Sequence, residues 1–322
     1  MPPAAVNSPA SQPLTEPIRW PAEAIREAVA PSLPGFTLEI LPEIDSSNSE
    51  LLRRFRAQIS DGAGTAPRPE PTLLVAEQQT AGRGRLGRHW QSRRGDSLTF
   101  SLGLPLQPAD WSGLSLVVGI SLAESLDPDP SAKTRNPGAA SIGLKWPNDL
   151  WLCDARGERK LAGILLETAS WEGLRYVVVG VGINIRPHAL AAPAEVAAAS
   201  PSAAMAALAP GCLQELSPDA DAALTLLCVV PPLVQALQAF EQFGFAPFQA
   251  RFARRDVLLG RAVRLSDGTD GTAHGTGENG ALRVLTSAGM KEITSSEISV
   301  RPVLDLPPTA CLAADKTGGR PC

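Results

Sequence analysis

The chain has 322 residues, of which 44% are hydrophobic and 19% charged, and its formal net charge is −4. This length and apolar content suffice for one large hydrophobic core and a smaller one. A net negative charge argues against non-specific nucleic-acid binding as the main task. No apolar run in the sequence approaches the ~20 residues that a membrane span needs.

The cysteines and the N-terminus indicate the cellular compartment in which the protein works. The five cysteines are odd in number, scattered, and without the spacing of a metal site. Free thiols are typical of a reducing compartment. The N-terminus lacks the basic and then apolar order of a signal peptide. We therefore expect a cytoplasmic protein.

The elements of the first two thirds follow from apolar periodicity and turn residues. Residues 1–34 are rich in Pro, Ala and Ser and predict a flexible leader with one helical stretch at 22–29. Ser47-x-x-Glu50 predicts a capping box that opens a helix. The later patterns predict strands at 72–76 and 97–104, a buried helix at 111–126, and strands at 142–145, 150–152, 161–168 and 174–185.

The last third of the chain differs from the rest in composition and in the spacing of its apolar residues. Residues 187–219 form an Ala/Pro-rich insertion, expected to be a loop with one short helix. Helical spacing follows at 222–243, and a second, shorter helix is expected at 247–255. Short strands separated by glycine turns then predict a small β-barrel. Those strands are expected at 262–265, 271–277, 281–285, 290–294 and 298–301.

Together these elements predict one large domain of strands and helices, followed by a small β-barrel. The expected divisions are a leader at 1–34, a main domain at 35–256 that contains the 187–219 insertion, a C-terminal domain at 257–304 and a polar tail at 305–322.

A glycine-spaced arginine loop, Gly82-Arg83-Gly84-Arg85-Leu86-Gly87-Arg88, follows the first of these strands. Residues 78–95 contain five arginines and no acid. Glycine lets the backbone approach a ligand closely, and fixed cations can hold a phosphate or carboxylate while charge moves on it. We call residues 79–95 the arginine loop and expect it to bind an anion.

Two other interpretations of this loop are a dinucleotide-binding motif and a solvated basic loop. Its letters match G-x-G-x-x-G, but that dinucleotide motif must open a helix and needs an acid about 20 residues later. Here a strand is expected at 97–104, and Asp96 comes too early. A dinucleotide site is therefore disfavoured, whereas a solvated basic loop without a ligand stays open.

Three further motifs carry polar residues. In Lys145-Trp146-Pro147-Asn148-Asp149, proline fixes a turn that aims Asn148 and Asp149 and exposes an indole edge, although an ordinary turn is an alternative. Lys160, before an apolar strand, either places an ammonium in a pocket or blunts the strand end. Gly180 and Gly182 interrupt a β-branched strand, which indicates close approach of a ligand or backbone, or packing alone.

Several familiar catalytic patterns are missing. The sequence has no phosphate loop of the G-x-x-x-x-G-K-[ST] type and no G-x-S-x-G nucleophile elbow. The three histidines are far apart in the sequence and are more typical of surface or packing positions. Arginines, a lysine and a polar turn without a protein nucleophile suggest transfer between bound substrates.

Five motifs succeed one another: Asp45-Ser46-Ser47-Asn48, Glu77-x-Gln79-Thr80-Ala81-Gly82-Arg83-Gly84-Arg85-Leu86-Gly87-Arg88-x-Trp90, the 145–149 turn, Lys160-x-x-Gly163-Ile164-Leu165-x-Glu167 and Gly180-x-Gly182-x-Asn184. Their order and spacing strongly resemble the biotin–protein ligases, which biotinylate the carrier subunit of acetyl-CoA carboxylase. The resemblance runs from about residue 43 to 302 of the 322 residues. It implies an α+β fold, with a mixed-sheet catalytic domain of the biotin/lipoate ligase type that has helices packed on it, and a small SH3-like C-terminal β-barrel.

The resemblance also implies a reaction. Biotin and ATP would form biotinyl-5′-AMP with Mg²⁺ assistance, and a lysine of the biotin carboxyl carrier protein would then take the biotinyl group. It implies no membrane partner and leaves room for a weak homodimer. No protein cage for a metal is expected, since Mg²⁺ would arrive with ATP, with Asp149 as a candidate partner of the metal or of a base.

Site residues are carried over by position. The residues implied for biotin are Ser46, Ser47, Asn48, Gln79, Arg83, Gly84, Arg85, Lys160 and Gly163. Those implied for the nucleotide are Arg88, Trp90, Asn148 and Asn184, and those implied for catalysis are Arg85, Lys160 and Asp149. Lys160 would hold the biotin carboxylate and the α-phosphate, and residues 83–85 would close over biotin and the adenylate.

The chain also departs from the family pattern. Ser47 stands where threonine is usual, the connection from Asp149 to Lys160 is long and predicts a longer hairpin, and the 187–219 insertion has no counterpart. No winged-helix segment precedes the core, so a monofunctional form that does not bind DNA is expected. A lipoate–protein ligase or octanoyltransferase of the same fold, and a biotin-sensing regulator without turnover, stay open as alternatives.

Overall fold

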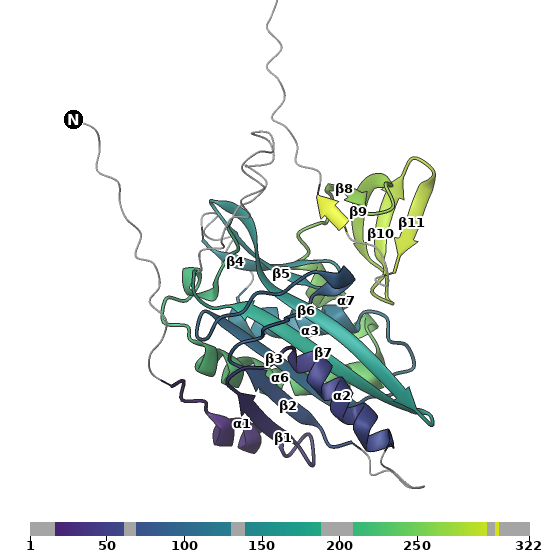
Figure 1. The fold of residues 1–322 in the computed structure, drawn as a ribbon. Helices are drawn as coiled ribbons and strands as arrows, with labels where there is room; N and C mark the ends of the chain where they lie inside the picture. Colours follow the sequence, from purple (N-terminus) through teal and green to yellow (C-terminus); the bar gives the residue numbers. More distant parts are fainter. Residues whose placement is uncertain (1–16, 61–68, 130–138, 188–208, 295–299, 303–322) are drawn as a thin grey trace, which may run out of the picture.

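A computed structural model describes residues 17–60, 69–129, 139–187, 209–294 and 300–302 (Figure 1). The expected leader before residue 17, most of the 187–219 insertion and the tail from residue 303 lie outside the described residues. The described part contains a large sheet with helices on it and a separate small sheet near the C-terminus (Figure 1).

The large sheet has seven strands in the order β1-β2-β3-β7-β6-β5-β4. β1 and β2 pair in parallel, whereas all other neighbours are antiparallel, so the predicted mixed sheet is confirmed. The strands are β1 (Thr37–Leu41), β2 (Thr72–Ala76), β3 (Ser97–Pro105), β4 (Ser141–Lys145), β5 (Asp149–Asp154), β6 (Gly157–Trp171) and β7 (Leu174–Asn184). β5 and β6 form the expected long hairpin, which turns at Asp154–Gly157.

Alternating side chains of the strands enter two different cores. Leu73 and Val75 of β2 pack in the larger core, whereas Leu74 between them packs in the smaller one. The larger core is covered by α1 (Ala22–Val29), α3 (Leu114–Leu126) and α6 (Ala222–Phe243). The smaller is covered by α2 (Ser47–Ser60), which lies across β2, β3 and β7 in Figure 1. The sheet is therefore covered on both faces.

The start of α2 differs from the predicted capping box. Ser46, not Ser47, precedes the helix: its hydroxyl accepts from Ser49 N at 3.4 Å and its carbonyl from Glu50 N at 3.0 Å. The Glu50 carboxylate pairs instead with Arg53 and Arg54, at 2.7 and 2.8 Å. The shift frees the backbone N–H of Ser47 for a bond inside the site, described below.

α6 corrects the expectation that no apolar run is long enough for a membrane. This helix of 22 residues contains an 18-residue stretch with a mean hydropathy of 1.7, and by length and composition alone it could cross a bilayer. Its apolar side chains, however, are largely buried in the larger core. A core helix of a folded protein passes the same test, and α6 packs as one.

The C-terminal part begins after η4 (Ala246–Phe248) and α7 (Gln249–Ala253), which replace the single helix expected at 247–255. Five antiparallel strands follow in the order β11-β10-β9-β8-β12, in agreement with the predicted SH3-like barrel. They are β8 (Ala262–Leu265), β9 (Asp270–Thr276), β10 (Leu282–Thr286), β11 (Gly289–Ile293) and β12 (Val300–Pro302). An ion pair of 2.7 Å between Arg261 and Glu158 joins this part to the large sheet.

Candidate functional site

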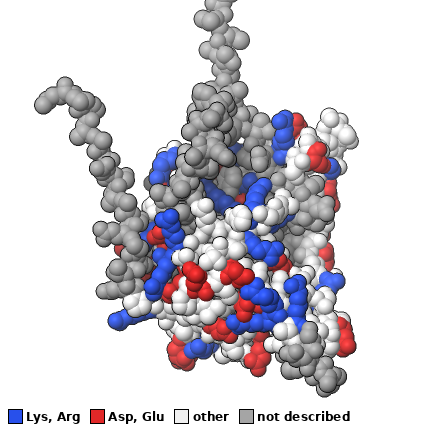
Figure 2. Space-filling view, viewed as in Figure 1, with Lys and Arg blue, Asp and Glu red and all other residues white. Residues whose placement is uncertain are grey.

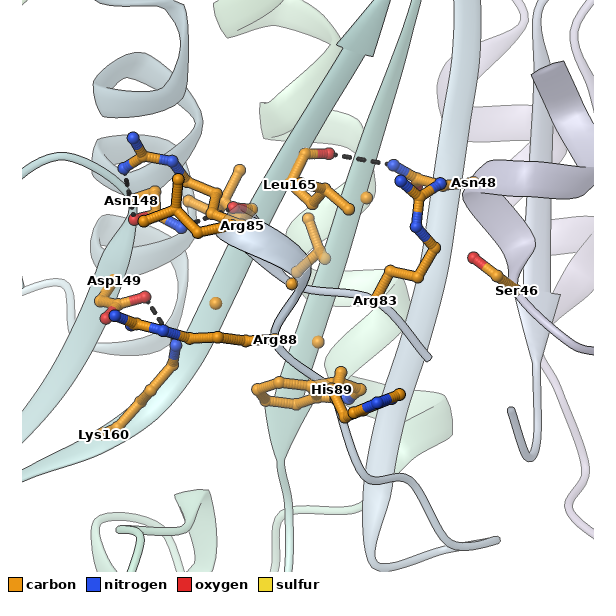
Figure 3. Close-up of a pocket in the computed structure, with 18 of the residues that line it drawn as sticks. Ser46, Asn48, Arg83, Arg85, Arg88, His89, Asn148, Asp149, Lys160 and Leu165 are labelled. Atoms are coloured by element: carbon orange, nitrogen blue, oxygen red, sulfur yellow. Dashed lines mark hydrogen bonds and ion pairs between the residues drawn. The ribbon is translucent and has the colours of Figure 1, made fainter. Parts of the chain in front are cut away.

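The sequence motifs meet at one pocket of about 940 Å³, measured out to open solvent, between the strands β6 and β7 and the arginine loop (Figure 3). Every residue carried over from the family except Asn184 lines it. Those residues are Ser46, Ser47, Asn48, Gln79, Arg83, Gly84, Arg85, Arg88, Trp90, Asn148, Asp149, Lys160 and Gly163. The fold therefore brings residues from separate motifs of the sequence into one pocket.

The arginine loop folds back on itself above the pocket. Trp90 N donates to Gly82 O at 2.9 Å, and Gly84 N donates to Arg88 O at 2.7 Å. Leu86 and Gly87 form the tip with φ angles of 57° and 70°. A Cβ on Gly82 would lie 2.3 Å from the carbonyl oxygen of Trp90, so only glycine permits this close pairing.

Two arginines of the loop have acidic partners that the local sequence does not reveal. Arg83 Nη1 lies 3.0 Å from Glu167 Oε1, on β6, and Arg94 Nε lies 2.8 Å from Glu77 Oε2, just after β2. Tertiary structure therefore supplies carboxylates at both ends of the loop. Basic and acidic side chains also lie interspersed on the face of the molecule that Figure 2 shows. The acids come from distant sequence positions.

Two arginines of the loop, Arg85 and Arg88, line the pocket beside the 145–149 turn (Figure 3). Arg85 Nη1 donates to Asn148 Oδ1 at 3.3 Å. Burial lowers the pKa of Arg85 from its usual value, although the negative charge of Asp149 acts in the opposite direction. Because burial removes water from this guanidinium, binding of an anion in place of that water is favourable.

Lys160 lies inside β6, not at its end, and its ammonium enters the pocket. Nζ is 2.8 Å from Asp149 Oδ1 and 5.9 Å from the centroid of the Trp90 ring. The pairing of β5 with β6 shifts register between Leu150 and Trp151, opposite Lys160. Such an irregularity re-aims a side chain, which accounts for the direction of this lysine.

In the opposite half of the pocket, neutral polar side chains bond to one another, and the one cation that the structure describes there, Arg83, is paired with Glu167. Ser47 N donates to Gln79 Oε1 at 2.8 Å, and Ser101 Oγ lies 2.7 Å from Ser47 Oγ and 2.6 Å from Asn48 Oδ1. Asn48 Nδ2 donates to Leu165 O at 3.2 Å. Sequence reasoning missed Ser101; its signal was a hydroxyl in the middle of the buried strand β3.

The glycines of β7 make room for side chains of this pocket. A Cβ on Gly180 would lie 2.2 Å from Asn48 Oδ1, and one on Gly182 would lie 2.3 Å from Trp90 Cε2. The side chains of Asn48 and Trp90 thus fill this space, in agreement with the alternative of packing. Gly163 does the same for Lys160, whose Nζ would be 3.2 Å from the added carbon.

The 145–149 turn aims its polar residues as expected. The Trp146–Pro147 peptide is cis, and Asn148 Nδ2 donates to Ile164 O at 2.8 Å. The predicted exposed indole edge is wrong: Trp146 is 1% exposed, and its Nε1 donates to Gly280 O at 3.1 Å. Trp146 therefore packs this turn against the C-terminal part.

Asn184 lies outside the pocket lining. Its side chain is buried, and Nδ2 donates to the carbonyls of Lys160 at 3.3 Å and Gly211 at 3.1 Å. It thus fixes the backbone that carries Lys160. His89, expected at a surface or packing position, is exposed and lines the pocket, as does the buried Phe100.

Comparisons with known proteins agree with this geometry. The sequence profile of the biotin/lipoate A/B protein ligase family matches residues 56–184. The bifunctional ligase/repressor BirA of Escherichia coli is 35% identical over 84% of this chain and 75% of its own length. The biotin–[acetyl-CoA-carboxylase] ligase of Paracoccus denitrificans is 30% identical over 80% of this chain and 98% of its own.

A solved structure supports the same assignment. The biotin protein ligase of Aquifex aeolicus, in complex with biotin and ATP, superposes with a TM-score of 0.60 at 30% identity, covering 83% of this chain and 99% of that one. The relative from Paracoccus denitrificans is matched over nearly its whole length. The chain belongs to the biotin protein ligases of the biotin/lipoate A/B protein ligase family.

Proposed function

We propose that this enzyme activates biotin with ATP and transfers the biotinyl group to a lysine of a biotin carboxyl carrier protein. A biotin carboxylate oxygen attacks the α-phosphorus, the bond to the β-phosphate oxygen breaks, and pyrophosphate leaves. The lysine amine of the carrier then attacks the carbonyl carbon of biotinyl-5′-AMP. An amide forms, AMP leaves, and one proton is released.

The observation that carries this proposal is the division of the pocket into two chemically different halves. The half with Asn48, Ser47 and Gln79 offers neutral hydrogen-bonding groups that suit an uncharged polar head group. The half with Arg85 and Lys160 offers cations where two anions must meet. One elongated substrate with a polar head and a carboxylate tail matches this division.

The proposed roles follow from position. Lys160 holds the biotin carboxylate next to the α-phosphate, because fixed cations stabilise the charge that develops there. Its ammonium must then share its contact with Asp149, 2.8 Å away. Arg85 and Arg88 neutralise the phosphates from the loop, and Trp90 and Asn148 line the nucleotide side. Asn184 acts on the nucleotide side only through the backbone of Lys160.

Magnesium fits this site as a companion of ATP. Within the described ranges, no three His, Cys, Asp or Glu side chains gather as a metal cage. Mg²⁺ usually needs only one or two protein carboxylates when phosphates supply other ligands. Asp149, the acidic residue in the lining, would be that carboxylate. The bound ion would supply neutralisation of phosphate charge.

The partners and location follow from the same proposal. The carrier domain is the protein substrate, and the enzyme is expected in the cytoplasm. We further propose that the chain does not bind DNA specifically, and a weak homodimer is compatible with its function.

Single-turnover mass spectrometry tests the proposal. Incubation with biotin and ATP should yield biotinyl-5′-AMP, and later addition of a biotin carboxyl carrier domain should add one biotinyl group to it. A carrier domain with its target lysine changed to arginine is the matched control and should stay unmodified. Adenylate formation without transfer would refute the ligase step, and no adenylate would refute the proposal entirely.

A further inference from the structure

The Glu167 carboxylate contacts two parts of the site that are far apart in the sequence. Oε1 lies 3.0 Å from Arg83 Nη1 of the arginine loop, and Oε2 accepts from Asn48 Nδ2, near the start of α2, at 3.0 Å. The side chain is only 19% exposed. A carboxylate with so little access to water depends on these two partners for its stability.

The Asn48 amide has one orientation because of its neighbours. Its two N–H groups donate to Leu165 O and Glu167 Oε2, which uses all its donors. Ser101 Oγ lies 2.6 Å from Oδ1 and donates to it, because Oδ1 can only accept. The amide is therefore left with acceptor capacity alone, on Oδ1. A ligand that bonds to Asn48 must present an N–H or O–H donor.

The other oxygen of Glu167 holds the loop. Arg83 points toward Asn48 in Figure 3, and its guanidinium also donates to Ser49 Oγ at 3.3 Å. Arg83 is about half exposed, so water can replace either partner. At the far end of the loop, Arg94 pairs with Glu77 in a similar way, and Glu77 bonds to Trp20, not to Asn48.

We propose that Glu167 is a positioning residue with two tasks. Oε2 fixes the Asn48 amide so that its oxygen can accept from an N–H of the substrate head group, and Oε1 holds the arginine loop beside the same pocket. The proposal rests on the proposed binding of biotin, whose ring system carries such N–H groups.

Glutamine at this position separates the two tasks, because it has one acceptor oxygen and no charge. The Asn48 donor is buried, so leaving it unpaired is costly, whereas Arg83 can turn to Ser49 and water. In Glu167→Gln the oxygen should therefore stay with Asn48, and the loop should be released. Glu167→Ala loses both contacts.

Two measurements decide the matter: the biotin Kd by calorimetry, and the rate at which trypsin cleaves the ligand-free arginine loop. Glu167→Gln should bind biotin within about twofold of wild type and be cleaved several-fold faster. Glu167→Ala should be cleaved as fast and bind about tenfold more weakly, as expected for one lost hydrogen bond. Glu77→Gln is the matched control, which should speed cleavage and leave the Kd unchanged.

Ser101→Ala gives a second measurement of the Asn48 task, for the case that Glu167→Ala does not fold. It should weaken biotin binding without changing the cleavage rate. Wild-type Kd in Glu167→Ala or Ser101→Ala, or wild-type cleavage in Glu167→Gln, would overturn the proposal. Failure of the wild-type protein to bind biotin would instead overturn the proposed function.

Discussion

Lys160→Ala should lower the adenylation rate far more than it lowers biotin affinity. Nζ lies 2.8 Å from Asp149 and enters the cationic half of the pocket. A unit charge about 4 Å from a phosphate oxygen is worth roughly 4 kcal/mol at an effective dielectric constant near 20. Losing one preorganised stabiliser of this kind should cost about 10²–10³ in rate, or ~3–4 kcal/mol.

Biotin affinity should fall less, since the contacts of Asn48 and Gln79 remain in the other half of the pocket. Lys160→Arg should not restore the rate fully, because a planar guanidinium cannot replace a compact ammonium in the same space. Pyrophosphate exchange and biotin calorimetry measure the two effects. Wild-type adenylation by Lys160→Ala would refute the reasoning.

Two controls separate the role of the ammonium from that of its partner. Lys160→Ala leaves Asp149 in the pocket without its cation, so part of the loss could arise from repulsion of phosphate. The double variant Lys160→Ala/Asp149→Asn removes that repulsion and should adenylate biotin at least about tenfold more slowly than Asp149→Asn alone, which keeps the ammonium. Lys291→Ala removes a lysine paired with Asp267 at 3.0 Å in the C-terminal part and should adenylate biotin normally.

Further predictions concern the loop, a glycine, a buried acid and DNA. Trypsin should cleave the arginine loop more slowly with biotin and ATP than without, because bound anions neutralise its cations; equal rates would count against an anion-ordered loop. Gly182→Ala should destabilise the fold by about 1–3 kcal/mol in urea, because the new carbon would lie 2.3 Å from Trp90, and an unchanged midpoint would exclude that clash. Burial raises the pKa of Asp256 from 3.8 to about 6. The ionised carboxylate therefore lowers the free energy of unfolding increasingly as the pH rises from 3.8 to about 6, and by the full amount at higher pH. Asp256→Asn should therefore gain up to about 3 kcal/mol at pH 8 and lose this advantage near pH 4; a gain independent of pH would contradict the burial argument. Gel shifts with the operator of its own biotin genes should show no selective binding at physiological salt, and nanomolar selectivity would overturn that expectation.

The strands were largely predictable because burial on one or both faces leaves a clear apolar pattern. β2 was predicted with its observed bounds, and the ends of β3 and β4 differ by one residue. α1 and α6 were also predicted with their observed bounds, whereas the start of α2 was not. The residue that caps α2 is Ser46 and not the predicted Ser47, because Ser47 N bonds to Gln79. Gln79 is 32 residues away, so no local pattern could reveal this bond.

The members of the candidate site could be named from motifs, but their partners could not. Glu167 and Glu77 meet the arginine loop only through the pairing of strands and the return of the chain over the sheet. Trp146 was misjudged for the same reason, because Gly280 covers its indole from the C-terminal part. Hydrogen bonds between distant segments depend on tertiary structure, which motif spacing does not encode.

Biotin-dependent exchange of pyrophosphate into ATP tests the central claim most directly, since it reports the first chemical step without a carrier protein. Parallel reactions contain biotin, lipoate or octanoate at equal concentration. The account predicts rapid exchange with biotin and only background exchange with the other two acids. Exchange supported by lipoate or octanoate but not by biotin would contradict it.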